Sequence, residues 1–362
     1  MQIGDRKIGL NHGPYIIAEI GVNHDGEVSR ALELTDAAAD SGADAVKLQF
    51  FETDRLMSKA AKLAAYQRNA GETDSIEMLR RLELTIDEMA QVVDRAHERG
   101  IHAIVTVFST ELVKVAETLA WDAYKSASPD IVNRPLLEAL MATGKPMIVS
   151  TGASTLDEVV RAAGWLEGAK DRLAVLQCVS CYPAALEDAA LGGCDALMAV
   201  LDCPIGYSDH TVSHHPVRLL TPLNVCIFEK HFTYDTSAAG PDHAASLNPE
   251  DFAAYVRYGQ NAYFNDDSVE VLKGVRSKEL FLTYFGPTEK RVLDCERDVR
   301  EVSRQSIISA RAIAPGTIIT REMLTIKRPG TGMLAYELDT VVGRTVCREI
   351  EADVPMVEED FE

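Results

Sequence analysis

Short hydrophobic runs rich in β-branched residues alternate with longer segments of helical periodicity between residues 15 and 264. Strands buried on both faces of a parallel sheet read as such runs, and helices connect consecutive strands. The predicted strands are 15–21, 45–50, 102–108, 123–128, 146–152, 173–179, 204–210 and 225–232. The clearest predicted helices are 28–41, 86–99, 133–143, 154–167 and 248–265. Eight βα units in about 250 residues predict a (β/α)₈ TIM barrel, with a doubly wound sheet as the alternative.

One connection in this pattern is long. Residues 51–84, after the second predicted strand, are charged and contain two short helix-like stretches. Long βα loops commonly serve as a lid or as a wall of the substrate site. We expect this connection to do so here.

The pattern changes after residue 265. We predict a barrel domain over 1–272, a charged and irregular linker over 273–304, and a small β-rich domain over 305–362. Within the last segment, residues 312–324 and 349–361 align by residue type, which indicates two similar units that pack together.

Composition narrows the class of protein. The 362 residues are 46% hydrophobic, which is enough for a substantial core, and the net charge of −20 disfavours nucleic acid or an anionic membrane as a partner. We find no signal peptide pattern and no apolar run long enough to span a bilayer, so we expect a cytoplasmic protein. Seven cysteines suit a reducing compartment, and we interpret Cys178 and Cys181, which form a CxxC, as packing residues.

Two histidines stand at the ends of consecutive predicted strands. His210 closes the seventh strand and His231 the eighth, so a barrel would bring them together at its catalytic face. Imidazole ligates Mn²⁺, Fe²⁺ and Zn²⁺ well, which predicts a metal site. A histidine that closes a strand can also be a hydrogen-bonded structural residue. For Asp209, which would point away from His210 on a strand, we expect a structural role.

Lysines and hydroxyls gather at the other strand ends. A phosphate needs positive charge and several donors in one place, and lysines inside a barrel are costly to bury without an anion. Different strands supply these groups: Lys47, Thr106, Lys125, Ser128, Ser150 and Ser208. Glu19 and Asp130 are candidate carboxylates for general-base work on a metal-bound water.

Six motifs occur in order along the barrel: Ala18-Glu-Ile-Gly-Val-Asn-His-Asp-Gly26, Val46-Lys-Leu-Gln49, Lys145-Pro-Met-Ile-Val-Ser-Thr-Gly152, Gly206-Tyr-Ser-Asp-His-Thr211, Glu229-Lys-His-Phe232 and Gly240-Pro-Asp242. Together they resemble the sialic acid synthase family, the phosphoenolpyruvate-dependent synthases of nine-carbon 2-keto sugar acids. The terminal segment, with Lys327-Arg-Pro-Gly-Thr-Gly332, resembles the antifreeze-like (SAF) domain attached to these barrels. The resemblance runs from residue 16 to residue 361.

The resemblance implies a role for each matching residue. His210 and His231 would hold a divalent metal, commonly Mn²⁺ with Mg²⁺ or Co²⁺ as alternatives, and Glu19 and Asp130 would be catalytic. Phosphoenolpyruvate would be surrounded by Lys47, Thr106, Lys125, Ser128, Ser150, Ser180 and Ser208. The sugar would contact Gln49, Tyr182, Asp242 and Arg328, the last from the C-terminal domain of the other subunit in a homodimer.

The implied reaction joins carbon 3 of phosphoenolpyruvate to the aldehyde of an open-chain acetamido sugar. Water then adds to carbon 2, and phosphate leaves by C–O cleavage, with the metal polarising the aldehyde. Three positions depart from the family pattern: Asp130 where many members have Glu, Ser180 where some have Asn, and Val107 where Pro is usual. The sugar stays open among N-acetylmannosamine, its 6-phosphate and diacetamido-trideoxy hexoses.

Two other functions are compatible with parts of the sequence. A class II-type aldolase that uses pyruvate also needs a metal on an α/β barrel. A non-enzymatic binding or scaffold protein could carry the antifreeze-like domain on a silent barrel. Such a barrel is not expected to keep two lysines, a glutamate and two histidines together at its active face.

Overall fold

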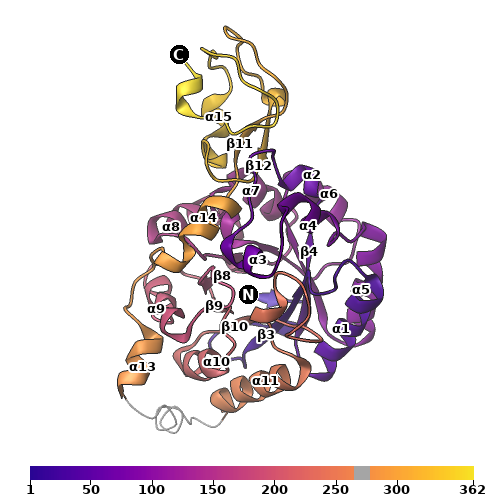
Figure 1. Cartoon of the computed structure of the whole chain (residues 1–362). Coiled ribbons are helices and arrows are strands. Elements are labelled where there is room, and N and C mark those ends of the chain that lie inside the picture. Colours follow the sequence, from indigo (N-terminus) through magenta and orange to yellow (C-terminus); the bar gives the residue numbers. More distant parts are fainter. Residues whose placement is uncertain (265–277) are drawn as a thin grey trace.

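Eight parallel strands close into a barrel in the computed structural model, which describes residues 1–264 and 278–362 (Figure 1). The strands are β3 (Tyr15–Gly21), β4 (Ala45–Phe50), β5 (His102–Val107), β6 (Ala123–Ser126), β7 (Met147–Ser150), β8 (Leu173–Cys178), β9 (Ile205–Asp209) and β10 (Ile227–His231). Because β10 pairs with both β9 and β3, the sheet has no edge. The predicted barrel is confirmed, and the doubly wound alternative is wrong.

The barrel interior is apolar at one end and polar at the other. Side chains alternate along each strand, so residues two apart share a face. On β10, the interior sequence is Ile227, Glu229 and His231, and on β4 it begins with Ala45 and continues to Lys47. The same change from apolar to polar occurs on the other strands, which puts the charged layer at their carboxyl ends.

A short hairpin closes the apolar end. Strands β1 (Gln2–Ile3) and β2 (Arg6–Lys7) pair antiparallel, and Ile3 and Ile8 pack on the lower interior residues, which include Ile17 and Ile104. In the described part of the chain, the polar end is therefore where a ligand can enter.

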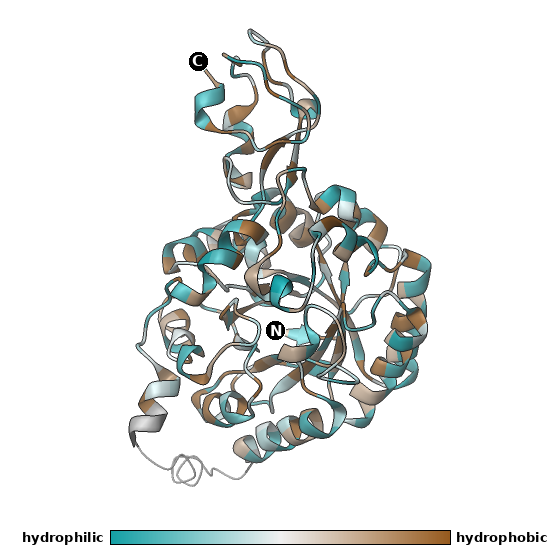
Figure 2. Ribbon diagram, in the orientation of Figure 1, coloured by the Kyte–Doolittle hydropathy of each residue, from teal (hydrophilic) through white to brown (hydrophobic). Residues whose placement is uncertain are grey.

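Helices cover the outside of the barrel. They are α1 (Val28–Asp40), α5 (Ile86–Glu98), α6 (Thr110–Ala116), α7 (Arg134–Ala142), α8 (Leu156–Trp165), α9 (Gly193–Met198), α10 (His215–Leu220) and α11 (Pro249–Phe264). Capping boxes at Thr85 and Thr155 begin α5 and α8, and Asn133 caps α7. Figure 2 shows hydrophobic residues on strands and inner helix faces, with hydrophilic residues outward. The predicted helices are confirmed within one or two residues, except that residue 265 lies outside the described part.

Residues 51–84, the β4–α5 connection, contain α2 (Thr53–Leu56), α3 (Ala65–Asn69) and α4 (Ser75–Arg80). Their apolar side chains form a cluster of their own with Val22 and Phe108 at the polar end of the barrel. This cluster holds the connection over the strand ends, where the sequence led us to expect a wall or lid.

The segment that we expected to be an irregular linker contains helices. These are α13 (Lys278–Phe285) and α14 (Arg297–Ser303), and residues 273–277 lie outside the described part. We call residues 286–304 the connector. It packs on the barrel through buried Lys290 and Glu296. The division into domains at 272 and 304 stays a prediction.

The C-terminal domain contains β11 (Ser306–Ser309), β12 (Leu324–Lys327) and α15 (Leu338–Val341). Its two similar segments contact each other, since Ile313 bridges Ile350 and both lie in one hydrophobic cluster. That cluster supports the interpretation of two units packed together.

Asp209 and Lys230 form a fully buried ion pair on the outer face of the barrel. The Lys230 Nζ lies 3.2 Å from Asp209 Oδ2, and Asp209 Oδ1 accepts hydrogen bonds from the backbone N–H and hydroxyl of Thr211. The structural role expected for Asp209 is confirmed.

All seven cysteines are free. Among the described helices, none is long and apolar enough to cross a membrane.

Candidate active site

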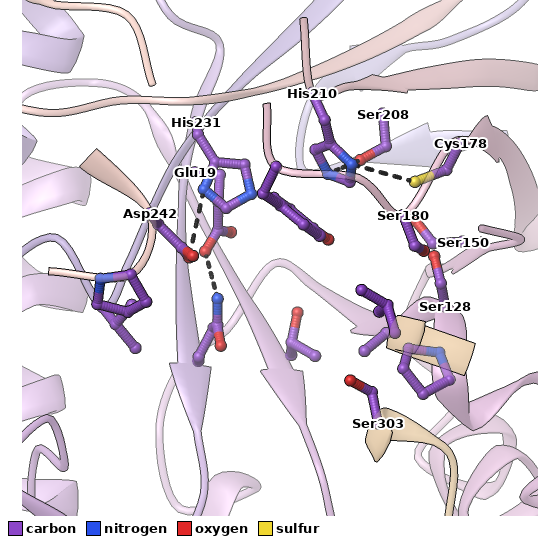
Figure 3. A pocket seen from close by; sticks show the side chains of 18 of the residues that line it. Glu19, Ser128, Ser150, Cys178, Ser180, Ser208, His210, His231, Asp242 and Ser303 are labelled. Carbon is purple, nitrogen blue, oxygen red and sulfur yellow. Dashed lines mark hydrogen bonds and ion pairs between the residues drawn. The ribbon is translucent and has the colours of Figure 1, made fainter. Parts of the chain in front are cut away.

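A pocket opens at the carboxyl ends of the strands, beneath the β4–α5 connection and the C-terminal domain. It is lined by every predicted site residue except Asp130: Glu19, Lys47, Gln49, Thr106, Lys125, Ser128, Ser150, Ser180, Tyr182, Ser208, His210, His231, Asp242 and Arg328. Figure 3 shows Glu19, His231 and Asp242 together on one side and Ser128, Ser150 and Ser180 on another. The strand register explains this grouping, because neighbouring strand ends meet at one level.

Glu19 and Lys47 form a buried ion pair on adjacent strands, where the backbone register pairs them directly. The Lys47 Nζ also donates to Thr106 Oγ1 at 2.9 Å, and Gln49 Nε2 donates to Glu19 Oε1 at 2.9 Å. Burial alone would lower the pKa of Lys47, but Glu19 and Glu229 raise it above its usual value. Lys47 is therefore a permanent cation. Burial raises the pKa of Glu19 although Lys47 opposes this, so Glu19 is a better proton acceptor than an ordinary carboxylate.

A second buried pair joins Lys125 and Glu229. The Lys125 Nζ lies 3.3 Å from Glu229 Oε1, and the Ser208 hydroxyl donates to the same oxygen at 2.9 Å. Burial would raise the pKa of Glu229, but Lys125 and Lys47 lower it, so the carboxylate stays ionised. Sequence reasoning did not select Glu229. The signal was present, since Glu229 stands two positions before His231 and therefore on the same interior face.

Hydroxyls from three strand ends converge near Gly152. A Cβ on Gly152 would lie 2.2 Å from Ser180 Oγ and 2.9 Å from Ser128 Oγ, so only glycine fits between them. The Gly152 N–H donates to Ser128 Oγ at 2.9 Å. The Ser150 Oγ is buried and has no hydrogen-bond partner among the described residues. This cluster offers donors to a ligand with many acceptor oxygens.

The two histidines lie side by side, with ring centres 5.4 Å apart. His210 Nδ1 lies 2.6 Å from the Val179 carbonyl oxygen, which orients the ring, and Nε2 lies 3.5 Å from Ser208 Oγ. His231 Nδ1 lies 3.6 Å from Asp242 Oδ2. The Tyr182 ring packs against both histidines, with its centre 4.1 Å from the ring centre of His210 and 5.7 Å from that of His231.

The histidine pair fits a metal that keeps open coordination positions. Burial, His210 and nearby lysines hold the pKa of His231 well below its usual value, so this ring is neutral, as a ligand must be. His210 differs: burial lowers its pKa, but Cys178 and the Val179 carbonyl carry it to about 9, so a metal would have to displace a proton from this ring. The described residues contain no cluster of three or more His, Cys, Asp or Glu side chains able to hold a metal. Two imidazoles would therefore need water or substrate oxygens to complete the shell.

Cys178 is buried and free, as expected of a packing cysteine, and it also lines the pocket. Its Sγ lies 3.7 Å from His210 Nδ1. Cys178 follows Leu176 on the interior face of β8, so the alternation along the strand places it in the polar layer.

The β4–α5 connection supplies a largely apolar wall. Its Met78, Leu79 and Leu82 line the pocket together with Val22 and Phe108. Tyr66 and Gln67 of α3 also line it. The connection was predicted as a wall, but none of these side chains was selected, because no periodicity in this segment distinguishes pocket positions from packing positions.

Arg328 reaches the pocket from the C-terminal domain of the same chain. Its backbone N–H donates to the Leu56 carbonyl at 2.9 Å, and its carbonyl accepts the Ser58 N–H at 3.1 Å. The Arg328 guanidinium lies 5.6 Å from the centre of the Phe108 ring. We expected a neighbouring subunit to supply Arg328. Here the connector carries the chain back over its own barrel, because it packs on the strand ends of that barrel. The homodimer stays a prediction.

Asp130 lies behind the pocket wall. It belongs to a 3₁₀ turn (Ser128–Val132) and is 1% exposed, while its neighbours Ser128 and Pro129 line the pocket. Burial raises the pKa of Asp130 to about 7, although Arg328 and Lys125 lower it. The structure thus does not place this carboxylate among the pocket-lining groups, and its catalytic role stays a prediction.

Comparisons with known proteins find matches to both the barrel and the C-terminal domain. Residues 34–267 match the NeuB family, and residues 304–362 match the SAF domain. An N,N'-diacetyllegionaminic acid synthase from Legionella pneumophila is 34% identical over 96% of this chain and 94% of that protein. An N-acetylneuraminate-9-phosphate synthase from Mus musculus is 30% identical over 99% of this chain and 95% of that protein.

A solved structure resembles the whole chain. The crystal structure of the spore coat polysaccharide biosynthesis protein SpsE from Bacillus subtilis superposes with a TM-score of 0.83 and 26% identity. The match covers 100% of this chain and 99% of that chain, so it includes the C-terminal domain as well as the barrel.

The raised pKa of Asp130 predicts a pH-dependent cost in stability. The folded state holds its proton up to about pH 7, whereas the unfolded chain loses it near 3.8. The stability associated with the protonated form is therefore full below pH 3.8 and is lost as pH rises to 7. From pH 4 to pH 8, we expect Asp130→Asn to gain up to about 4 kcal/mol of unfolding free energy relative to the wild type. Urea unfolding at several pH values measures this difference, and the exposed Asp202→Asn is the control. Parallel curves for Asp130→Asn and wild type would contradict it.

Proposed function

The chain belongs to the NeuB family and is an enzyme of that family, and from this premise we propose that it condenses phosphoenolpyruvate with an open-chain acetamido hexose. The products are a nine-carbon 2-keto sugar acid and phosphate. The observation that carries the proposal is a pocket in which two buried lysines and a cluster of hydroxyls lie beside a pair of histidines.

The two anionic groups of phosphoenolpyruvate match two parts of the pocket. Phosphate has the larger number of acceptor oxygens, so we assign it to the hydroxyl cluster near Gly152 together with Lys125. The carboxylate is assigned to Lys47 and Thr106, which already share a hydrogen bond. Both lysines are buried and ion-paired, so their positive charge acts in a medium that screens it little.

Glu19 is assigned the proton transfer. Its carboxylate lies in the same layer as His231, with which it is paired in the strand register. In this position it accepts the proton of the water that adds to carbon 2. Lys47 holds the carboxylate in place and lowers the cost of its negative charge. When bound at His210 and His231, a divalent metal such as Mn²⁺ supplies Lewis-acid polarisation of the sugar aldehyde.

The alternatives fit the pocket less well. Pyruvate in an aldolase would use one carboxylate site and leave the hydroxyl cluster without a ligand. A silent barrel would bury two lysines, two glutamates and two histidines with no ligand to justify their desolvation. The pocket is therefore better explained by a phosphorylated co-substrate.

The sugar end of the pocket favours a neutral, acylated and deoxygenated hexose. Of the lysines and arginines that line the pocket in the described residues, Lys47 and Lys125 are assigned to phosphoenolpyruvate, which leaves Arg328. The positive charge of Arg328 acts on Asp130, whose pKa it lowers. The apolar wall next to Arg328, which includes Phe108, suits methyl groups, either of an acetamido group or at carbon 6. We propose a diacetamido-trideoxy hexose, which agrees with the name of the Legionella relative.

Product formation tests the proposed reaction, and removal of the Ser150 hydroxyl tests the assignment of the phosphate. When the protein is incubated with Mn²⁺, phosphoenolpyruvate and each of several acetamido hexoses, we expect at least one sugar to give equal amounts of phosphate and 2-keto acid. Ser150→Ala should raise KM for phosphoenolpyruvate about tenfold or more, because it removes one hydrogen bond to a charged group. Ser126→Ala is a matched control, since its Oγ is also buried without a partner in the described residues but does not line the pocket. Absence of turnover with every aldose would refute the function, and an unchanged KM would refute the assignment of Ser150.

Metal binding is tested separately from activity. His231→Ala should weaken Mn²⁺ binding by at least about tenfold, measured as metal retained after dialysis. The control is His214→Ala, a histidine outside the pocket lining. Wild-type metal content in His231→Ala would overturn the assignment of this site.

The sugar is tested by comparing kcat/KM for N-acetylmannosamine, its 6-phosphate and diacetamido-trideoxy hexoses. We expect the last class to be preferred by about tenfold or more, because its methyl groups bury apolar surface on the wall. Met78→Gln should lower kcat/KM for that sugar and leave KM for phosphoenolpyruvate unchanged. Preference for the 6-phosphate would contradict a neutral substrate.

A further inference from the structure

The connector forms hydrogen bonds with the loops after β7 and β8, next to the hydroxyls that we assign to the phosphate. Its Glu296 is fully buried, and one carboxylate oxygen accepts the backbone N–H groups of Ala153, at 2.6 Å, and Ser180, at 2.8 Å. The other oxygen accepts the Leu293 N–H at 2.9 Å. One side chain from outside the barrel thus joins the loop after β7 to the loop after β8.

Ala153 adopts a backbone conformation that needs such support. Its φ is +50°, in the left-handed region, which costs a residue with a Cβ free energy. Both of its backbone polar groups are bound by the connector. Glu296 accepts its N–H, and its carbonyl accepts hydrogen bonds from Arg300 at 2.5 Å and Arg304 at 3.2 Å. The same two arginines hold Glu158 of α8, which anchors them to the barrel.

These two loops meet at the proposed phosphate site. Gly152, which precedes Ala153, lies so close to Ser180 Oγ that a Cβ at position 152 would not fit. Glu296 binds the backbone N–H of Ser180 itself, so it fixes the backbone position from which that hydroxyl extends. A small shift of either loop would separate the donors that a phosphate needs together.

We propose that Glu296 is a positioning residue for phosphoenolpyruvate, holding the loops after β7 and β8 at the separation that the phosphate requires. The inference rests on the proposed function, because it takes phosphoenolpyruvate as the ligand. It adds a role for the connector that the pocket lining does not reveal, since Glu296 does not itself line the pocket.

A carboxylate is needed at this position. Three backbone N–H groups point at its two oxygens, and a carboxylate accepts on both. Glutamine has one acceptor oxygen and an NH₂ group that would face at least one N–H. The variant Glu296→Gln keeps the size of the side chain but must lose at least one of these hydrogen bonds.

We expect Glu296→Gln to raise KM for phosphoenolpyruvate about tenfold or more, while KM for the sugar changes less than twofold. The control is Glu301→Gln, an exposed position on α14, the helix that begins directly after Glu296. Direct binding of phosphoenolpyruvate can be measured without sugar, by the shift in melting temperature that it causes. Binding should weaken in Glu296→Gln and stay at the wild-type level in Glu301→Gln.

The binding assay separates the two proposals. If the wild type does not bind phosphoenolpyruvate, the proposed function fails. If the wild type binds it and Glu296→Gln binds equally well, the positioning role fails. Equal losses of affinity for phosphoenolpyruvate and for sugar would also overturn it, because they indicate a general structural effect. Should Glu296→Gln not fold, Arg300→Lys tests the same loop through the Ala153 carbonyl, with the same selective rise expected.

Discussion

The structure depends on the burial of opposite charges in pairs at one end of a closed barrel. Glu19 with Lys47, and Lys125 with Glu229, lie almost completely out of water on four different strands. Neither member of a pair could be buried alone without a large desolvation penalty. Because each pair spans two strands, the pairing holds only when the strands close in the observed register. The charge pattern and the fold therefore require each other.

Much of this could be predicted because a barrel strand has a simple geometry. Alternation puts Lys47 and Gln49 on one face and separates Asp209 from His210, and the strand count brings His210 next to His231. Glu229 follows from the same rule, because it stands two residues before His231 on β10. The β4–α5 connection and the connector have no such period. Which of Met78, Leu79 and Leu82 meets the pocket, and which backbone groups Glu296 binds, depend on tertiary packing that sequence spacing does not encode.

The connector is more than a tether between two parts of the chain. Through Glu296 it binds the loops after β7 and β8 behind the pocket lining, and it leads within a few residues to the domain that carries Arg328. The sequence of this segment is charged, and that property suggested an irregular linker. In the structure, several of those charges are directed inward, toward backbone groups and Glu158, so the charged composition here reflects anchoring.

The bridge between Met57 and Arg328 has a consequence for how such proteins can diversify. The β4–α5 connection and the C-terminal domain are far apart in sequence, yet their backbones pair across the mouth of the barrel. They are therefore two halves of one cover. A change of substrate obtained by exchanging the C-terminal domain with that of a relative would succeed only when the matching connection is exchanged with it. The two segments should consequently be inherited as a unit, even though most of the barrel lies between them in the sequence.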